Sequence, residues 1–171
     1  LETDLTNPKS LYGKSKLDGE VEVLFNTHWA IVIRTSWLYS SHGNNFVKTM
    51  MKIAKENGII NVVSDQVGTP TYAADLAKAI LDIIPKVKPK NKFEIYNYSN
   101  EGVCSWYDFA QEIMDIAKIN CKINPIETKE YPTAAVRPHY SVLNKSKIKK
   151  EFGISIPYWK HSLEKCIKKL S

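Results

Sequence analysis

The sequence predicts an α/β fold built on a parallel sheet. Runs of β-branched and aliphatic residues alternate along the chain with stretches whose apolar residues recur at helical spacing. The segment 29–39, WAIVIRTSWLY, opens with successive apolar residues, as expected of a strand buried on both faces, and further strands are expected at 59–65 and 93–98. Strands separated by helices are joined by crossover connections, so we expect them to pair in parallel.

The first two helices have recognisable boundaries. The first is expected to begin at Asn7-Pro8, because a capping side chain followed by proline is a common helix start, and its apolar spacing continues to about Phe25. The second, 46–57, precedes Gly58, which occupies the position where helices commonly end in a left-handed residue.

The later helices are bounded by similar signals. Helix 72–84 is expected to stop at Pro85. Helix 106–118 follows Ser105, which can form a capping box with Asp108. The rest of the chain is expected to contain a looser region over 120–144 and short helices at 145–151 and 157–170.

Length and composition favour one compact domain in a reducing compartment. The 171 residues have an average apolar content, and the longest apolar run, 29–33, is far too short to span a membrane. The chain shows no secretory leader, so we expect a cytoplasmic protein. Its cysteines are odd in number and widely spaced, which argues against a disulfide framework or a zinc site: Cys104, Cys121 and Cys166.

The formal net charge is +6, and much of the excess lies in the lysines of 145–153 and 160–170. A nucleic-acid interface is one interpretation, but lysines beside glutamate on an amphipathic helix are more typical of a solvated face. We therefore expect neither a nucleic-acid nor a membrane partner, whereas an anionic small molecule suits the charge.

Tyr12 and Lys16 are four residues apart in the first predicted helix. With nine tyrosines and this many lysines, chance alone gives about one such pair, so the spacing by itself carries no weight. The chemistry is nevertheless suitable, because residues four apart share a helix face and an ammonium group lowers the pKa of a nearby phenol. Such a phenol can exchange protons with a substrate oxygen.

The wider context is specific. YGKSKLDGE at 12–20, RTSW at 34–37, GNNF at 43–46, GTPT at 68–71 and Arg-Pro at 137–138 follow one another along the chain. Together they resemble the dTDP-4-dehydrorhamnose reductase family, a branch of the extended short-chain dehydrogenases/reductases that acts on nucleotide-activated sugars in bacterial cell-surface polysaccharide synthesis. The resemblance implies the C-terminal part of a Rossmann-type parallel sheet with a smaller α/β substrate-binding lobe.

The resemblance also implies roles at a hydride-transfer site. Tyr12 is the expected general acid for the C4 carbonyl oxygen of dTDP-4-dehydro-L-rhamnose, and Lys16 lowers its pKa and binds the nicotinamide ribose. Arg34, Thr35 and Ser36 are expected beside the nicotinamide of NADPH or NADH, at the carboxyl end of a strand.

Other motif residues are expected at the substrate. By resemblance Trp37 lies beside the deoxysugar, although a core tryptophan is the alternative. Asn44, Asn45 and Phe46 open a helix whose free N–H groups favour a diphosphate, and capping by an asparagine is compatible with that.

The loop 66–71 is expected to shape the nucleotide end of the substrate pocket, because glycine and proline give it an unusual course. Its expected site residues are Gln66, Gly68, Pro70 and Thr71. Arg137 is a candidate clamp for the diphosphate, since a guanidinium forks onto phosphate oxygens; a surface arginine is the alternative.

No G-x-G motif occurs among the seven glycines. We therefore expect residues 1–40 to be the end of an NAD(P)-binding core whose glycine-rich part lies outside this sequence, and 41–171 to be mostly the substrate lobe, interleaved with remaining core elements. Alone, this piece should be inactive. Its unpaired sheet edges favour self-association, so a homodimer is a candidate assembly, and a divalent ion, Mg²⁺, is a candidate requirement by resemblance.

Two alternatives stay open. One is a non-catalytic relative, the regulatory subunit of methionine adenosyltransferase, which shares this scaffold. The other is a sugar-nucleotide epimerase or dehydratase, which retains its dinucleotide and consumes no reduced cofactor.

Overall fold

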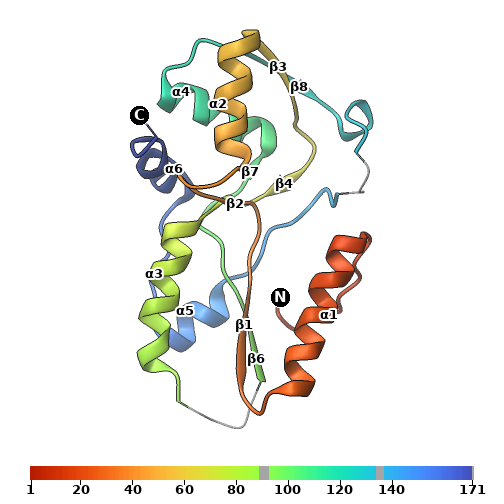
Figure 1. The fold of residues 1–171 in the computed structure, drawn as a ribbon, viewed down its shortest axis with the longest axis vertical. Coiled ribbons are helices and arrows are strands. Elements are labelled where there is room, and N and C mark those ends of the chain that lie inside the picture. The colour runs from red at the N-terminus through yellow and green to blue at the C-terminus, as the bar shows by residue number, and fades with distance from the viewer. Residues whose placement is uncertain (89–92, 134–136, 171) are drawn as a thin grey trace.

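The computed structural model describes residues 1–88, 93–133 and 137–170. Helices and strands alternate as predicted, and the longer strand pairs are parallel (Figure 1). The pairs are β1 (Ala30–Arg34) with β6 (Phe93–Asn97), β2 (Leu38–Tyr39) with β5 (Thr71–Tyr72) and β3 (Ile59–Val63) with β8 (Lys122–Ile126), all parallel, and β4 (Val67–Gly68) with β7 (Cys104–Ser105), antiparallel.

The molecule has two halves along its long axis (Figure 1). In the first half, which we call the strand half, the β1–β6 pair lies between α1 (Leu11–Asn26) on one side and α3 (Ala73–Ile83) with α5 (Ser146–Phe152) on the other. Side chains of α3, β6 and α5, and of the residues just after β6 and α5, form a buried cluster: Ala79, Ile83, Tyr96, Tyr98, Ile148, Phe152 and Ile156.

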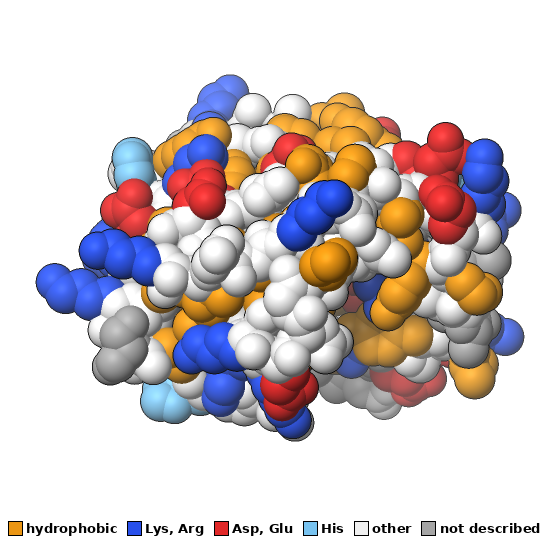
Figure 2. Space-filling view, turned by 90° about the horizontal axis from the view of Figure 1, so that it is seen from above, with side chains coloured by type: hydrophobic (Ala, Val, Ile, Leu, Met, Phe, Trp, Pro, Cys, Tyr) orange, Lys and Arg blue, Asp and Glu red, His pale blue; other side chains and the backbone are white. Residues whose placement is uncertain are grey.

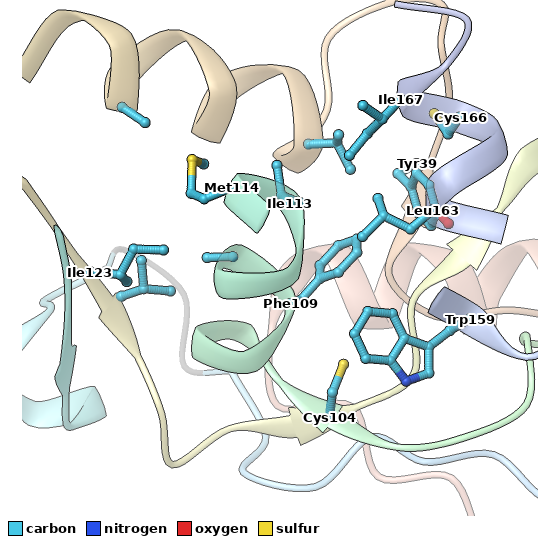
Figure 3. Close-up of a cluster of buried hydrophobic side chains, with 14 of the residues drawn as sticks. Tyr39, Cys104, Phe109, Ile113, Met114, Ile123, Trp159, Leu163, Cys166 and Ile167 are labelled. Atoms are coloured by element: carbon cyan, nitrogen blue, oxygen red, sulfur yellow. The ribbon is translucent and has the colours of Figure 1, made fainter. Parts of the chain in front are cut away.

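The second half, which we call the pocket half, holds the larger core. Here α2 (Phe46–Asn57) and α4 (Trp106–Ala117) pack on the β3–β8 pair, and α6 (Trp159–Ile167) packs on α4. Figure 3 shows Phe109, Ile113 and Met114 of α4 pointing into this core, and Phe109 and Ile113 are wholly buried.

A buried polar network ties elements of the two halves together. The Asn100 side chain, which is wholly buried, accepts a hydrogen bond from Tyr72 N at 2.8 Å. It donates to Asp75 Oδ2 at 2.8 Å and to Ser162 Oγ at 3.1 Å. Because unpaired polar groups are costly inside a protein, this mutually satisfied set fixes how α3 and α6 meet.

Several predicted boundaries are confirmed. Gly58 ends α2 in the left-handed conformation, with φ of 67°, and Ser105 forms the capping box with Asp108 at the start of α4. Helix α3 ends at Ile83, and Pro85 lies in a short 3₁₀ turn, Ile84–Lys86, that follows it.

The predicted start of the first helix is wrong. The helix begins at Leu11, and its cap is Ser10, whose hydroxyl accepts a hydrogen bond from Gly13 N at 3.1 Å. The Asn7-Pro8 pair lies before the helix. Both the Asn7-Pro8 pair and Ser10 suit a helix start, so residue type alone does not decide between them.

The strand predictions also need correction. The segment 29–39 is interrupted after Arg34, and Trp37 within the break adopts a positive φ of 47°. Strand β3 alternates between exposed and buried side chains, so it is not buried on both faces. Strand β8 and the 3₁₀ turn Thr128–Glu130 lie in the region predicted to be loose, in which 134–136 are outside the described residues.

Candidate functional site

Tyr12 and Lys16 lie in the first turns of α1. The Lys16 ammonium is 5.3 Å from the centre of the Tyr12 ring, so the two side chains share a helix face as predicted. Tyr12 is 71% exposed. Helix α1 runs antiparallel to β1, so that its N-terminal end, which carries this pair, lies on the same side as the carboxyl end of β1 (Figure 1).

Arg34 is the last residue of β1, as expected for a residue at the carboxyl edge of the sheet. Its guanidinium donates to both carboxylate oxygens of Glu20 on α1, from Nε to Oε1 at 2.9 Å and from Nη2 to Oε2 at 2.6 Å. Hydrogen bonding to Glu20 raises the pKa of Arg34 above its ordinary value, although burial acts to lower it. Glu20 was not predicted as a site residue, although it lies one helical turn beyond Lys16 within the motif YGKSKLDGE.

Thr35 and Ser36 connect the end of β1 to the loop 66–71. The Thr35 hydroxyl is 3.3 Å from the Thr71 hydroxyl, and the Ser36 hydroxyl donates to the carbonyl of Thr69 at 3.1 Å. The structure therefore brings together two motifs that are more than thirty residues apart in sequence.

A polar atom without a partner lies beside this edge. Oδ1 of Asn97, the last residue of β6 and the register partner of Arg34, is buried and accepts no hydrogen bond from the residues that the structure describes. The carboxyl edge of the β1–β6 pair thus carries the kind of polar group that holds a dinucleotide in parallel α/β sheets, and the residues present fit such a ligand.

Trp37 stacks on Trp106, the first residue of α4, with ring centres 3.5 Å apart and planes 11° from parallel. Gly68 lies against the Trp37 ring: a Cβ on Gly68 would be 2.6 Å from Trp37 Cε2 and 2.6 Å from Ser141 Oγ. Only glycine allows this approach. The half-buried Trp37 also packs on the core of the pocket half, which favours the core-tryptophan alternative. Its contact with a sugar stays a prediction.

A cavity of about 350 Å³ lies in the pocket half beside these residues. It brings together three predicted substrate residues, Phe46, Gln66 and Arg137, from three separate parts of the chain. Trp106 and Tyr131, which the sequence analysis did not assign, also line it. A capping box signals the start of a helix at Trp106, but no local pattern shows that this ring faces a cavity.

The remaining predicted substrate residues do not line this cavity. Asn45 caps α2, accepting from Lys48 N at 3.4 Å, and Asn44 is exposed beside it. Pro70 and Thr71 are wholly buried, so neither side chain is open to a ligand in this structure.

The lysine-rich segment is less solvated than predicted. Lys145 is buried, with its ammonium 3.3 Å from the Asn100 carbonyl oxygen and 3.5 Å from Glu101. Lys149 pairs with the same carboxylate at 2.7 Å. On the face of the pocket half seen in Figure 2, basic and acidic side chains are interspersed with hydrophobic ones.

No group of His, Cys, Asp or Glu side chains within the described ranges is arranged to hold a metal ion. The described residues therefore give no support to the candidate Mg²⁺ requirement. Across the same ranges, no helix is both long and apolar enough to cross a membrane.

The whole chain matches a known protein family. The RmlD substrate binding domain model matches residues 1–171. The chain belongs to this family. It is 42% identical over 171 residues to the dTDP-4-dehydrorhamnose reductase of Aggregatibacter actinomycetemcomitans, covering 95% of the chain and 58% of that relative.

Solved structures agree. The crystal structure of the Bacillus anthracis dTDP-4-dehydrorhamnose reductase in complex with NADP matches with a TM-score of 0.91 and 38% identity, covering 98% of this chain and 58% of the other. This likeness confirms the Rossmann-type α/β fold and relationship to an NADP-binding oxidoreductase.

A more distant match, dTDP-glucose 4,6-dehydratase of Bacillus anthracis in complex with NAD, has a TM-score of 0.77 at 17% identity, covering 99% of this chain and 54% of the other. At that identity the likeness shows the fold alone.

Proposed function

We propose that this chain supplies the acid–base helix and the substrate pocket of an NAD(P)H-dependent reductase. The reaction is reduction of the C4 ketone of dTDP-4-dehydro-L-rhamnose to dTDP-L-rhamnose. The chain spans 58% of the length of the reductase relative described above, so this is the activity of the intact protein. One observation carries the proposal: Tyr12 and Lys16 share the end of α1 that faces the carboxyl edge of β1.

Tyr12 is the proton donor in this proposal. Its exposed hydroxyl can reach a ligand without any rearrangement of the core. As the carbonyl carbon is reduced, the phenol gives its proton to the ketone oxygen, and the Lys16 ammonium stabilises the phenolate that remains. The reduced nicotinamide supplies the hydride when bound. Thr35, Ser36 and the carboxyl edge of β1–β6 are the groups of this chain that would hold the nicotinamide end.

The pocket half orients the sugar nucleotide. Arg137 can fork onto the diphosphate, and the apolar and aromatic wall formed by Phe46 and Trp106 suits a base or a sugar ring. We assign 1–40 to the end of the cofactor-binding core and 41–171 mostly to the substrate lobe. Strand β6 lies within 41–171 but pairs with β1, so the chain returns to the cofactor-binding core after the substrate lobe has begun. This pairing supports the proposed interleaving of the two parts.

Cofactor consumption separates this function from its alternatives. A reductase oxidises one NADPH or NADH for each ketone reduced, whereas an epimerase or dehydratase shows no net oxidation. A regulatory subunit of methionine adenosyltransferase shows no turnover and is retained by that synthetase in a pull-down. The assay follows absorbance of the reduced nicotinamide with the intact protein and dTDP-4-dehydro-L-rhamnose.

Replacement of the acid tests the mechanism. In the intact protein, Tyr12→Phe should lower kcat by at least about a hundredfold and leave KM nearly unchanged, because general acid catalysis contributes roughly 10²–10⁴ in rate. The matched control is Tyr107→Phe on α4, whose hydroxyl accepts a hydrogen bond from Gln111 Nε2 at 2.8 Å, and it should keep kcat. Normal turnover by Tyr12→Phe would remove Tyr12 from the mechanism.

A further inference from the structure

Helix α1 is weakly attached to the rest of this chain. None of its sixteen residues is buried, and Leu11 and Phe25 at its two ends are 84% and 80% exposed. Its capping bond from Gly13 to Ser10 is local and cannot fix where the helix lies against the sheet. Because the position of Tyr12 depends on that placement, some contact with the sheet has to set it.

The Glu20–Arg34 pair makes that contact. Within the ranges that the structure describes, it is the only side-chain hydrogen bonding that joins α1 to another element. Both side chains are largely shielded, with 18% of Glu20 and 22% of Arg34 exposed. A shielded, two-pronged pair is directional and less screened by salt than an exposed one, so it can fix a helix in both height and rotation.

Glu20 also shares a helix face with the proposed acid. Tyr12, Lys16 and Glu20 recur at intervals of four residues, which places them one above another along the same side of α1. Arg34 ends β1, which is held in register by β6 from Ala30 to Arg34. The pair therefore joins the proton-donating face of the helix to the carboxyl edge of the sheet.

We propose that Glu20 is a positioning residue for the reaction, acting through Arg34. The fork between them sets the height and rotation of α1 against β1 and so directs Tyr12 and Lys16 toward the carboxyl edge. This inference rests on the proposed function. It also gives Arg34 a role different from the predicted cofactor contact, because its guanidinium faces the protein.

The expected kinetic result separates rate from binding. In the intact protein, Glu20→Gln should lower kcat about tenfold, since a misplaced acid or base reacts slowly. KM for dTDP-4-dehydro-L-rhamnose should stay within about twofold, because the cavity lies in the pocket half. The control is Glu22→Gln, whose carboxylate accepts from Asn26 on the same helix and from no other described residue; it should keep kcat.

Reversal of the charges tests whether the pair itself matters. Arg34→Glu alone should lose at least as much kcat as Glu20→Gln, and the double variant Glu20→Arg with Arg34→Glu should recover most of that loss. Wild-type kcat in Glu20→Gln, or a reversed pair as slow as Arg34→Glu alone, would overturn the proposal. A fall in melting temperature without a fall in kcat would do the same, since it would show a structural role only.

Amide hydrogen exchange gives a readout that does not need turnover. The amides of α1 should exchange faster in Glu20→Gln than in wild type or Glu22→Gln, because the helix is released from β1. If the intact wild type reduces no ketone, the proposed function is wrong. Hydrogen exchange would still test whether the Glu20–Arg34 pair holds α1 against β1. Unchanged exchange in α1 would overturn the attachment even in an active reductase.

Discussion

Helices α1 and α4 are held in the molecule by different forces. Helix α4 buries Phe109, Ala110 and Ile113 completely, within a core shared with two other helices and a strand pair (Figure 3). Helix α1 is longer but has no fully buried residue, and within the described ranges one ion pair is its only side-chain link to the sheet. The pocket is thus built on apolar packing within this chain, whereas the placement of the proposed acid depends on a directional polar contact.

The difference has an energetic consequence. Burying large side chains stabilises the fold in proportion to the apolar area removed from water, and a closely packed core tolerates small changes of side-chain volume poorly. An ion pair contributes less to stability but fixes orientation. Changes in the α4 core should therefore act on folding, and changes around α1 should act on rate.

The largest expected effect is in the α4 core. Phe109→Ala should lower the free energy of unfolding by about 3–5 kcal/mol, because the side chain is wholly buried among the rings of Tyr39, Phe46 and Trp159. Urea unfolding of residues 1–171, followed by tryptophan fluorescence, measures it.

The control for this prediction is on α1. Phe25→Ala removes the same side chain from an 80% exposed position and should change the free energy of unfolding by less than about 0.5 kcal/mol. Equal losses in the two variants would mean that α1 packs in solution as firmly as α4.

A smaller effect is expected at the junction of the stacked tryptophans. Gly68→Ala should cost about 1–3 kcal/mol, since the added carbon would overlap Trp37 and Ser141. The displaced Trp37 ring should also leave Trp106, and near-ultraviolet circular dichroism would show the loss of their stacking.

Gly19 on α1 offers the matched substitution. A Cβ at Gly19 meets no atom within 4 Å, and alanine is the better helix former, so Gly19→Ala should raise stability by up to about 1 kcal/mol. If Gly68→Ala had wild-type stability and an unchanged dichroism spectrum, the prediction would be wrong. The stacked rings of Trp37 and Trp106 would then adapt to an added carbon more readily than a packed core does.

The smallest effect concerns Asp65, which precedes the loop 66–71. Its carboxylate accepts from Thr128 N at 2.9 Å and from the Thr128 hydroxyl at 2.7 Å, and these bonds hold its pKa below the ordinary value. A pKa lower in the folded than in the unfolded state stabilises the fold above the unfolded pKa, near ~4, and this contribution is lost as pH falls through the folded pKa.

Asp65→Asn should therefore be less stable than wild type at neutral pH, and the difference should shrink at about pH 3. Urea midpoints at the two pH values measure the difference, and Asp18→Asn, on the exposed face of α1, provides the same change of charge. A difference that grows toward low pH would contradict the sign of the shift.

Local signals in the sequence were sufficient where the structure depends on neighbours along the chain. The Ser105–Asp108 box and the glycine after α2 were correctly placed, since capping is settled within one helical turn. The same-face arrangement of Tyr12 and Lys16 was also predictable, because it follows from helix geometry alone.

Long-range pairing set what local signals could not. Strand β8 contains Pro125 and lies in a region without a strand pattern, and it forms because β3 offers its edge to it. Residue type also did not decide between Ser10 and Asn7 as the cap, since both suit that position.

Residue type and spacing were enough to predict the α/β class, most of the helices, the caps at Gly58 and Ser105, and the order of the motifs. Three contacts could be seen only in the folded chain: Trp37 stacks on Trp106 against Gly68, Arg137 shares a cavity with Phe46, and Glu20 is hydrogen-bonded to Arg34. Each of those contacts joins residues at least fourteen positions apart, and such contacts form only when the whole chain has found its packing.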